Sequence, residues 1–472
     1  MLTRSFVAKC AAMTRRLSHP STTIVVSACI ALFALEVRIS SQTGFVARDP
    51  GVRGGDAGAG DPLPGLTSQE LDYFNAGKAE FEEAEEIDEG IGPRMNLDSC
   101  GGCHLQPVLG GSSPPMNPQF TFANKDGGTD TVPSFITANG PVREARFIKN
   151  HDGTADGGVH ALFTITGRAG ADSCKLTQPD FATELGNRNV IFRIPTPVFG
   201  AGLIEIIPDS ALLANQAAAA ATKSSLGISG RANFQVAGRA VTGQMNHNGN
   251  DGTISRFGWK AQNKSLLIFS GEAYNVEMGI TNDLFQTERD ENADCQYAET
   301  PNSVTDMTAA TPSGALSAIE KFSFFMRMMA PPAPSLNVTG ATAASIATGQ
   351  SLFTSTGCAF CHTPSLKTGS AKMKALAYQT VNLYSDLLLH DMGVGLSDGV
   401  SQGEAGPREF RTAPLWGLGQ RLFFLHDGRA SDLITAIKAH QSLGSEANSV
   451  ASKYNSLTES QKQSLLNFLR SL

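Results

Sequence analysis

Cys-Gly-Gly-Cys-His at residues 100–104 and Cys-Ala-Phe-Cys-His at residues 358–362 repeat one pattern, Cys-x-x-Cys-His, in the two halves of the 472-residue sequence. This pattern is the attachment signature of a c-type haem. Two thiols at this spacing can add to the vinyl groups on one porphyrin edge, and the next residue brings its imidazole under the iron. The two pentapeptides therefore predict two covalently bound haem c groups.

Other uses of paired cysteines fit these pentapeptides less well. A zinc ribbon usually joins two Cys-x-x-Cys knuckles within about 15–40 residues, and neither copy has a local partner. A thioredoxin-like dithiol needs no histidine after the second cysteine. The predicted haem-binding residues are Cys100, Cys103, His104, Cys358, Cys361 and His362, with His104 and His362 as the proximal iron ligands.

The N-terminus has the order of an export signal. Four basic residues between positions 4 and 16 precede an apolar run at 24–35, which is too short to span a bilayer comfortably. Residues 1–42 are therefore predicted to direct export to the periplasm by general secretion. Retention of this segment as an N-terminal anchor stays open, and a lipoprotein-like box that ends at Cys29 is a further alternative.

The remaining cysteines agree with an oxidising compartment. Of eight cysteines, two lie in the N-terminal segment and four in the pentapeptides, which leaves Cys174 and Cys295. An even pair in an exported protein predicts a disulfide, which would close a loop of about 120 residues and contribute roughly 4–5 kcal/mol. Two unrelated buried thiols are the alternative.

The net charge excludes one class of partner. The chain has a formal charge of −7 and a pI near 5.8, and no run rich in Lys and Arg occurs after residue 16. Proteins that bind nucleic acid usually carry a basic patch. We therefore expect no nucleic-acid partner.

A linker and a helix are predicted before the first pentapeptide. Residues 43–66 are rich in Gly, Asp, Ala and Pro, the composition of a flexible, solvated linker. Thr67 or Ser68 can then cap a helix. Its apolar residues recur near helical spacing at Leu71, Phe74 and Phe81.

The first haem region is predicted over 67–330, and it carries a long insertion. Residues 120–260 read as short strands and long loops between Gly, Pro and Asn residues. The apolar runs that suggest strands are 161–166, 190–194 and 203–207, and 217–221 is an alanine-rich helix fragment.

A proline-rich linker at 331–343 separates this region from a second one, because proline cannot continue a helix. Residues 344–472 are predicted as one cytochrome c domain. A helix over 344–354 leads to the second pentapeptide, and a terminal helix begins after its cap, Thr458.

In cytochrome c folds the first and last helices cross. This crossing would bring Phe468 and Leu469 against Leu352 and Phe353, and 317–328 is the candidate closing helix of the first region. The predicted fold class is therefore mainly α, with two cytochrome c-type haem domains, the first with a long strand-and-loop insertion.

Several longer motifs, in the same order, resemble the di-haem oxidoreductase family, whose members are also described as di-haem peroxidases or thiol oxidoreductases. The resemblance covers about residues 67–472. It rests, besides the first pentapeptide, on Gly92-Pro93, Gly110-Gly111 and the segments RFGWKA at 256–261, EMGIT at 277–281, HDMG at 390–393, FRTAPLWG at 410–417 and HDGRA at 426–430.

This family is similar to the bacterial di-haem cytochrome c peroxidases and to the di-haem enzyme that matures methylamine dehydrogenase. The resemblance implies a periplasmic protein with an electron-entry haem and a reactive haem. It also implies a calcium ion, whose ligands it does not identify. The implied partners are small redox proteins, a cytochrome c or a cupredoxin, together with a small-molecule oxidant.

The ligand opposite His362 decides the properties of the second haem. In the related peroxidases a methionine lies fourteen residues after the histidine of a His-x-Gly turn. Here that turn begins at His426, and the same count reaches His440. We therefore predict His362 and His440 as the ligand pair, with Met392 as the alternative. A second imidazole gives a lower potential than a thioether, so this haem departs from the peroxidase pattern.

The first haem has no such histidine, because residues 105–125 contain none. Met116 and Met278 are the predicted ligands if this iron is six-coordinate. If neither binds, the iron is open to peroxide, oxygen or a small substrate. Glu277 and Glu272 are then candidate acid–base groups that deliver a proton to the leaving oxygen.

The two tryptophans and three arginines are further candidates. Trp259 and Trp416 both lie in family motifs, and either could relay electrons between the haems or pack against a haem edge. Arg256, Arg411 and Arg429 could pair with haem propionates, because a guanidinium binds a carboxylate bidentately. The Asp-Gly-Arg turn favours Arg429, and we expect Arg429 and Trp416 to contact a haem.

These patterns predict a periplasmic di-haem c-type cytochrome that acts as an electron-transfer oxidoreductase and is peroxidase-like at its first haem. Glu277 and Trp259 are the predicted catalytic residues. The alternative is a pure electron carrier in which both irons are six-coordinate.

Overall fold

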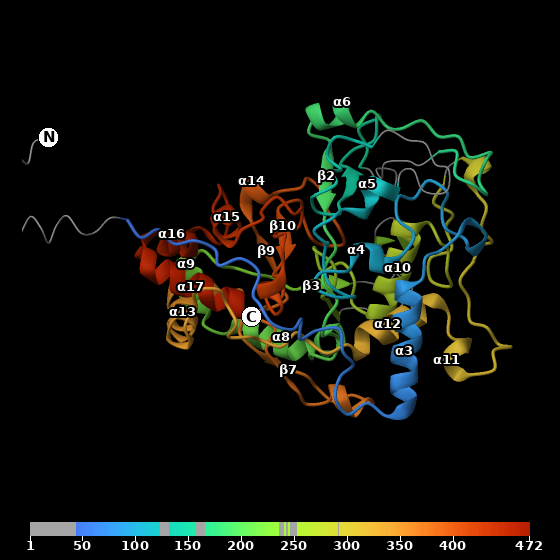
Figure 1. Ribbon diagram of the computed structural model, residues 1–472. Helices are drawn as coiled ribbons and strands as arrows, with labels where there is room; N and C mark the ends of the chain where they lie inside the picture. The colour runs from blue at the N-terminus through green and yellow to red at the C-terminus, as the bar shows by residue number, and fades with distance from the viewer. Residues whose placement is uncertain are drawn as a thin grey trace, which may run out of the picture. The chain divides into compact units, whose positions relative to one another are not determined.

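The computed structural model describes residues 44–122, 132–155, 166–235, 240–241, 244–245, 253–290 and 292–472. The predicted export segment at 1–42 lies outside these residues. Residues Arg48–Leu472 form one compact unit (Figure 1). In the described ranges, no helix is both long enough and apolar enough to cross a bilayer.

Helices dominate the described chain, and its strands form only two-stranded antiparallel sheets there. The helices are α3 Ser68–Glu82, α4 Cys100–Cys103, α5 Pro118–Phe122, α6 Phe181–Gly186, α7 Ala201–Glu205, α8 Asp209–Ala217, α9 Ala220–Leu226, α10 Leu266–Met278, α11 Pro312–Ala315, α12 Ala318–Met328, α13 Ala343–Thr356, α14 Gly393–Leu396, α15 Leu433–Ala439, α16 Asn448–Ser456 and α17 Glu459–Ser471. The strand pairs are β1 Glu144–Phe147 with β2 Val190–Arg193, β3 Asn233–Gln235 with β6 Thr253–Ser255, β4 Ala240–Val241 with β5 Gln244–Met245, β7 Leu366–Lys367 with β8 Thr380–Val381, and β9 Leu389–Asp391 with β10 Glu409–Arg411. The mainly α class is therefore confirmed.

Helices α3 and α12 cross tightly beside the first pentapeptide (Figure 1). A Cβ on Gly77 of α3 would collide with the carbonyl oxygen of Lys321 on α12, so only glycine permits this approach. One turn further along each helix, the rings of Phe81 and Phe325 lie 5.1 Å apart. The segment 317–328 thus forms the helix that closes over α3.

The N-terminal cap of α3 forms as predicted, but one of the three apolar residues predicted for its buried face is exposed. Thr67 and Glu70 form a capping box in which each side chain accepts from the other residue's backbone N–H. Phe74 and Phe81 are buried as predicted, whereas Leu71 is exposed.

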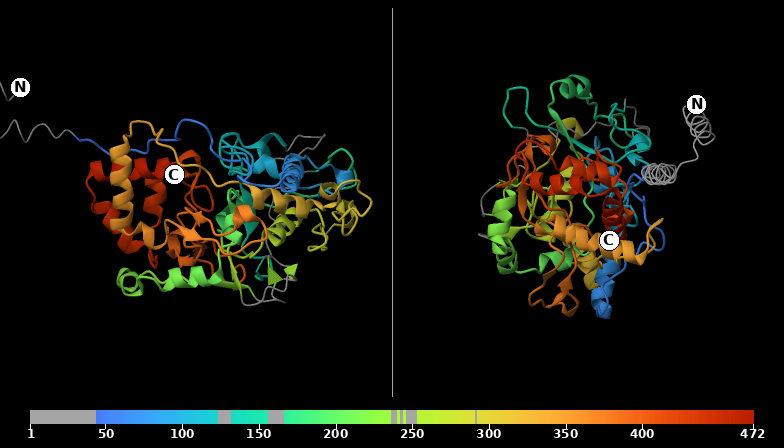
Figure 2. Two further views of the ribbon diagram at one scale, coloured as in Figure 1. Left: turned by 90° about the horizontal axis from the view of Figure 1, so that it is seen from below. Right: turned by 90° about the vertical axis from the view of Figure 1, so that its left-hand side faces the viewer.

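Helices α13 and α17 repeat the same crossing beside the second pentapeptide (Figure 2, left). A Cβ on Gly349 would collide with the carbonyl oxygen of Ser464. Phe353 and Phe468, each four residues further on, lie 5.4 Å apart. The predicted contact between the first and last helices of this region is therefore confirmed, and both helix pairs share a glycine followed by a phenylalanine one turn later.

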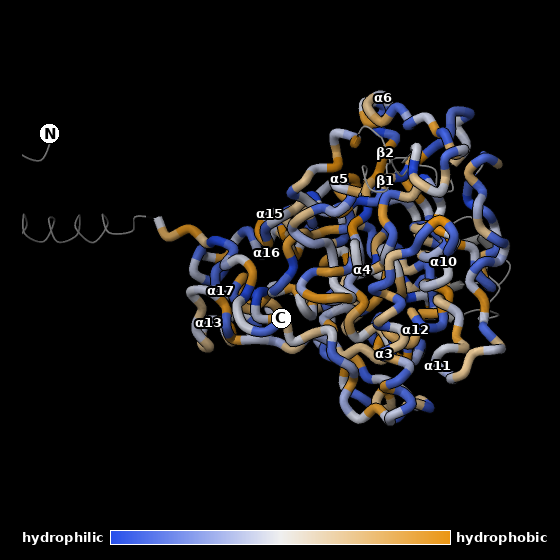
Figure 3. Tube along the Cα trace, turned by 45° about the vertical axis from the view of Figure 1, so that its right-hand side comes forward, coloured by the Kyte–Doolittle hydropathy of each residue, from blue (hydrophilic) through white to orange (hydrophobic). Residues whose placement is uncertain are grey.

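Strands β1 and β2 and helix α6 enclose a small core of their own. Figure 3 shows apolar stretches at all three elements, and Ala145, Phe181 and Ile136 are buried among them. The aromatic rings of Phe135 and Phe192 pack there, 5.0 Å apart. The run at 190–194 thus forms strand β2 as predicted.

The run at 203–207, predicted as a strand, belongs to helix α7 instead. A short apolar run that is buried on all sides has no periodicity to separate strand from helix. Gly200, with φ of 64°, begins the helix at its N-cap. The alanine-rich fragment at 217–221 is interrupted between α8 and α9, and the run at 161–166 lies outside the described residues except for its last one.

Residues 48–66 are anchored to the rest of the unit at a few points, although much of this segment is exposed, as its composition predicts. Arg53 is buried and donates to the carbonyl oxygens of Asp56 and Ala333. Asp49 forms a buried ion pair with Arg470 at 2.7 Å. Composition alone does not reveal the contacts with Ala333 and Arg470, because these two residues lie far from this segment in the sequence.

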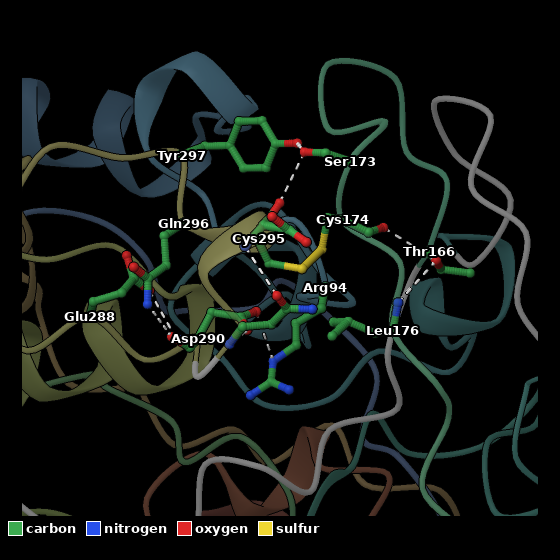
Figure 4. Close-up of a disulfide and its surroundings, with 12 residues drawn as sticks. Arg94, Thr166, Ser173, Cys174, Leu176, Glu288, Asp290, Cys295, Gln296 and Tyr297 are labelled. Carbon is green, nitrogen blue, oxygen red and sulfur yellow. Dashed lines mark hydrogen bonds and ion pairs between the residues drawn. A yellow bond between two sulfur atoms is a disulfide. The ribbon is translucent and has the colours of Figure 1, made fainter.

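Cys174 and Cys295 form a disulfide, which confirms the predicted pair (Figure 4). Both cysteines are buried. Beside the bond, Ser173 donates to the carbonyl oxygen of Asp294 at 3.0 Å, and its hydroxyl meets that of Tyr297. The bond therefore ties the loop around residue 174 to the segment that follows α10.

Replacing Cys174 and Cys295 together with Ala should lower the free energy of unfolding by about 2–5 kcal/mol, because the bond closes a long loop. Denaturation of the exported wild type and variant measures this difference, and a non-reducing peptide map should show the two peptides linked. The control is Ser173→Ala, which keeps the bond. Equal stability of the double variant and the wild type would contradict the prediction.

Candidate haem sites

The first pentapeptide forms helix α4 at the wall of a cavity, here named the first cavity. Ser99 caps this helix by accepting from the backbone N–H of Gly102 at 3.1 Å. Cys100, Cys103 and His104 all line the first cavity. The motif therefore presents two thiols and one imidazole to a single space.

His104 is held in place by backbone carbonyl groups and an aromatic ring. Its Nδ1 lies 3.0 Å from the carbonyl oxygen of Gly111, and the ring of Phe81 meets it edge-on at 5.9 Å. Burial lowers the pKa of His104 to about 4. The ring is therefore neutral and oriented by the backbone, as a metal-binding imidazole requires.

The second pentapeptide repeats this arrangement at a second cavity, lined by Cys358, Cys361 and His362. The Nδ1 atom of His362 lies 3.2 Å from the carbonyl oxygen of Tyr384, and Phe353 packs on the ring at 6.4 Å. Burial, followed by the charge of nearby His440, lowers the pKa of His362 to about 4. Both motifs thus offer a neutral, oriented imidazole.

A second imidazole faces His362 across the second cavity. His440 lies directly after α15, and its Nδ1 is 2.8 Å from the carbonyl oxygen of Ala436. The ring centres of His362 and His440 are 6.5 Å apart. Two imidazoles that each bind a metal at about 2 Å have ring centres separated by roughly 6–6.5 Å. The pair therefore has the spacing that one iron between them requires.

Among the described residues, two arginines of the second cavity donate hydrogen bonds to carbonyl oxygens. Arg411 donates to the carbonyl oxygens of Gly258 and Thr412, and Arg421 donates to that of Pro414. The Nε of Arg421 is buried and has no hydrogen-bond partner in the described chain. Burial lowers the pKa of each guanidinium to about 10. Buried cations of this kind need anions, which the two propionates of a haem would supply.

Three other residues predicted to contact a haem or its propionates are placed elsewhere. Arg429 pairs with Asp427 at 2.5 Å and is not among the residues that line either cavity. Arg256 is engaged by Asp209 and by the carbonyl oxygens of the α7 end. Trp416 is buried in the main core and also lines neither cavity.

The remaining candidates around the second cavity are Met392, His426 and His390, all of which line it. His426 stacks on the ring of Phe410 at 4.2 Å, and burial lowers its pKa to about 2. His390 lies between Asp386 at 3.0 Å and Glu446 at 2.8 Å. Both nitrogens of His390 are therefore occupied.

Among the described residues, the one cluster of His, Cys, Asp and Glu side chains close enough to hold a metal ion does not suit the implied calcium ion. The group there that could hold a metal ion is Cys361, Asp386 and His390. Calcium takes six to eight oxygen ligands, and Cys361 belongs to the haem motif. This group therefore fits neither calcium nor a second, independent metal.

The first cavity is more polar than the second and contains no histidine besides His104 among its described residues. Glu277 of α10, Glu144 and Arg146 of β1 and buried Gln119 line it. Arg146 and Glu144 form an ion pair at 2.6 Å. Burial and then the charge of Glu144 raise the pKa of Glu277 to about 8. Although Glu277 is exposed by its surface area, it lines the first cavity, where the surrounding protein reduces the solvation of its carboxyl group.

The methionines predicted for the first iron lie away from this cavity. Met116 is 71% exposed, and Met278 is buried in the main core. Neither is among the residues that line the first cavity, which does include Met326 of α12. Glu272 is buried behind the cavity and accepts from Asn263.

Trp259 lines both cavities. Its indole N–H donates to the carbonyl oxygen of Ile194 at 2.9 Å, and its ring meets that of His426 edge-on at 6.4 Å. The structure therefore brings Trp259, unlike Trp416, to the place between the two sites.

Sequence reasoning missed part of both sites. Arg421 lies just beyond the FRTAPLWG segment, and only its burial distinguishes it from other arginines. Glu144 and Arg146 stand in the region that reads as short strands and long loops, where no strand was predicted at β1, and Gln119 lies just before it. A carboxylate and an arginine two residues apart were the available signal.

Comparisons with known proteins agree with the haem assignment. A family model described as "Di-haem oxidoreductase, putative peroxidase" matches residues 155–472. Among solved structures, hydrazine synthase of Kuenenia stuttgartiensis, pressurised with 20 bar xenon, is similar at 16% identity and a TM-score of 0.24. That match covers 43% of this chain and 60% of the other, less than two thirds of its length, and it carries no argument about function. No curated protein matches the chain.

Proposed function

We propose that this chain, which belongs to the di-haem oxidoreductase, putative peroxidase family, is a haem oxidoreductase whose two haems have different tasks. The first haem reacts with a small oxidant, of which a peroxide is the favoured class. The second haem, between His362 and His440, passes electrons. The observation that carries this proposal is the asymmetry of the cavities: the second has an imidazole 6.5 Å from that of His362, whereas the described lining of the first has acid–base groups instead.

The residues of the first cavity suit proton delivery. A haem in this cavity supplies the redox chemistry at an iron held by His104. Glu277 holds a proton at neutral pH because its pKa is raised to about 8. It can give this proton to the oxygen that leaves when an O–O bond breaks. Arg146 and Gln119 then orient the polar end of the substrate.

The protein between the cavities suits electron transfer. Trp259 lines both cavities, so it offers the second haem an aromatic route to the first. In this proposal the electrons come from a small redox protein, a cytochrome c or a cupredoxin. The protein acts in the periplasm, after export, where c-type haem is attached.

Spectra of the as-isolated protein with both haems test the proposal. We expect a low-spin signal from the second haem together with high-spin charge-transfer absorption and an axial high-spin EPR signal from the first. Two low-spin haems without a high-spin component would contradict it. A mass that shows no added haem would contradict the cofactor itself.

One observation favours the alternative, a pure electron carrier. Met326 is the methionine among the residues that line the first cavity, and a thioether is a common sixth ligand in cytochromes c. Under the proposal, Met326→Ala leaves the spectrum of the first haem unchanged. If this variant converts a low-spin first haem into a high-spin one, the electron-carrier function is correct.

A further inference from the structure

A buried tyrosine and a buried glutamate form a pair at the edge of the first cavity. Tyr274 of α10 lines that cavity, and its hydroxyl donates to Oε1 of Glu85 at 2.6 Å. The exposed fractions of the two residues are 4% and 7%. Neither residue has a role in the proton delivery or the electron route described above.

Glu85 is a buried carboxylate whose charged neighbours are also carboxylates. Burial, and after it the carboxylates Glu80, Glu83 and Glu89, raise the pKa of Glu85 to about 7. A buried carboxylate that is not balanced by a cation lowers stability. The hydrogen bond from Tyr274 offsets part of this cost, and Glu85 remains a ready acceptor for the phenolic proton.

A chain of aromatic contacts joins Tyr274 to the proximal histidine. Its ring meets that of Phe322 at 5.1 Å, and Phe322 meets Phe81 at 6.0 Å. Phe81 in turn meets the imidazole of His104 at 5.9 Å. Each contact is within the range of ordinary aromatic packing, so no gap interrupts the route between the phenol and the iron ligand.

We propose that Tyr274 is a redox-active residue that gives one electron to the first haem while Glu85 takes its proton. The inference rests on the proposed function, because a peroxide must first have oxidised that haem. One electron leaves the Tyr274 ring for the haem, the phenolic O–H bond breaks, and the proton forms a new O–H bond on Glu85. A neutral tyrosyl radical results.

The pair returns to its starting state when the redox partner supplies an electron to the radical and Glu85 gives back the proton. Tyr274 thus stores one of the two oxidising equivalents of a peroxide. Until the redox partner supplies an electron, the haem itself therefore carries one oxidising equivalent fewer.

Rapid mixing of the two-haem protein with hydrogen peroxide, followed by freezing, tests the proposal through two separate readouts. The first is loss of peroxide, which reports the proposed function. The second is EPR, in which we expect a narrow organic radical signal that sharpens when the tyrosines are ring-deuterated. Tyr274→Phe should remove this signal and prolong the life of the peroxide-oxidised haem.

Two further variants separate a redox role from a structural one. Tyr73→Phe is the matched control: Tyr73 stacks on Phe324 at 5.0 Å and is not among the residues that line the cavities, so its loss should leave the radical unchanged. Glu85→Gln keeps an acceptor for the hydroxyl but removes the base, and it should lower the radical yield several-fold. If Tyr274→Phe does not fold, the radical yield of Glu85→Gln tests the proposal by itself.

The outcomes are distinguishable. Loss of peroxide without a tyrosyl radical, or a radical that persists in Tyr274→Phe, overturns the inference and leaves the proposed function standing. An unchanged radical yield in Glu85→Gln also overturns it. If the wild type does not consume peroxide at all, the proposed function fails, and the inference fails with it.

Discussion

Glu277→Gln should lower the turnover of peroxide by about 10²- to 10⁴-fold, the usual contribution of a positioned acid–base group. The amide keeps the size of the side chain but has no proton to deliver to the leaving oxygen. Stopped-flow measurement of peroxide consumption by the two-haem protein gives the ratio of rates. Glu277 lines the same cavity as Cys100 and Cys103, so the bound haem content of the variant must be measured beside the rates, and the prediction is a loss of turnover at equal haem content.

The dependence on pH provides an independent check of this role. The pKa of Glu277 is raised to about 8, so the carboxyl group is protonated below this pH and ionised above it. Wild-type turnover should therefore fall as the pH rises through about 8, and the fall should be absent in Glu277→Gln.

Glu272→Gln is the matched control for Glu277. It makes the same chemical change on the same helix, at a carboxyl group whose pKa burial raises to about 7, but Glu272 does not line the first cavity among the described residues. Its effect on turnover should stay below about tenfold. Equal losses in the two variants would mean that buried charge in α10, and not proton delivery, explains the result.

His440→Met should raise the potential of the second haem by roughly 0.1–0.3 V, part of the range of about 0.8 V that axial ligands span. A thioether stabilises reduced iron relative to an imidazole. Redox titration measures the shift, and a charge-transfer band in the far red should mark the new methionine ligand on ferric haem.

Met392→Ala tests the alternative ligand in the same cavity. Met392 lines the second cavity, but His440 already has the ring separation from His362 that an iron requires. We therefore expect Met392→Ala to leave the spectrum of the second haem unchanged. If it makes that haem high-spin while His440→Ala does nothing, the ligand assignment is wrong.

The features that the sequence revealed depend on short-range chemistry. Thr67 and Thr458 were identifiable as caps because a cap and its N3 partner are three residues apart. The terminal helix followed from the spacing of its leucines, whereas its contact with α13 was expected from the cytochrome c fold. His440, identified by the count from His426, lines the second cavity, and its role as an iron ligand stays a prediction.

The features that it did not reveal depend on contacts between distant segments. The Asp-Gly-Arg turn favoured Arg429 as the partner of a haem propionate, yet this side chain pairs with Asp427. Arg421, in the wall of the second cavity, has instead a buried Nε without a hydrogen-bond partner in the described chain. The polar group of the first cavity combines Gln119, β1 and α10, which meet only in the folded chain. Helix α7, Ala201–Glu205, was missed because a short, largely apolar run shows no clear helical period.

The two helix crossings close after very different lengths of chain. Gly77 meets α12 about 240 residues later, whereas Gly349 meets α17 about 115 residues later, a difference of one doubling that adds only about 0.6 kcal/mol of closure entropy. The two crossings differ more in the time at which they can form during export than in closure entropy. If the chain emerges from a translocation channel N-terminus first, Phe81 can contact Phe325 only after α12 has emerged. The first pentapeptide is therefore exposed long before its closing helix is present. The second pentapeptide meets its partner after a shorter length of chain. Because α17 ends about 140 residues after α12, the first haem site can close well before the second.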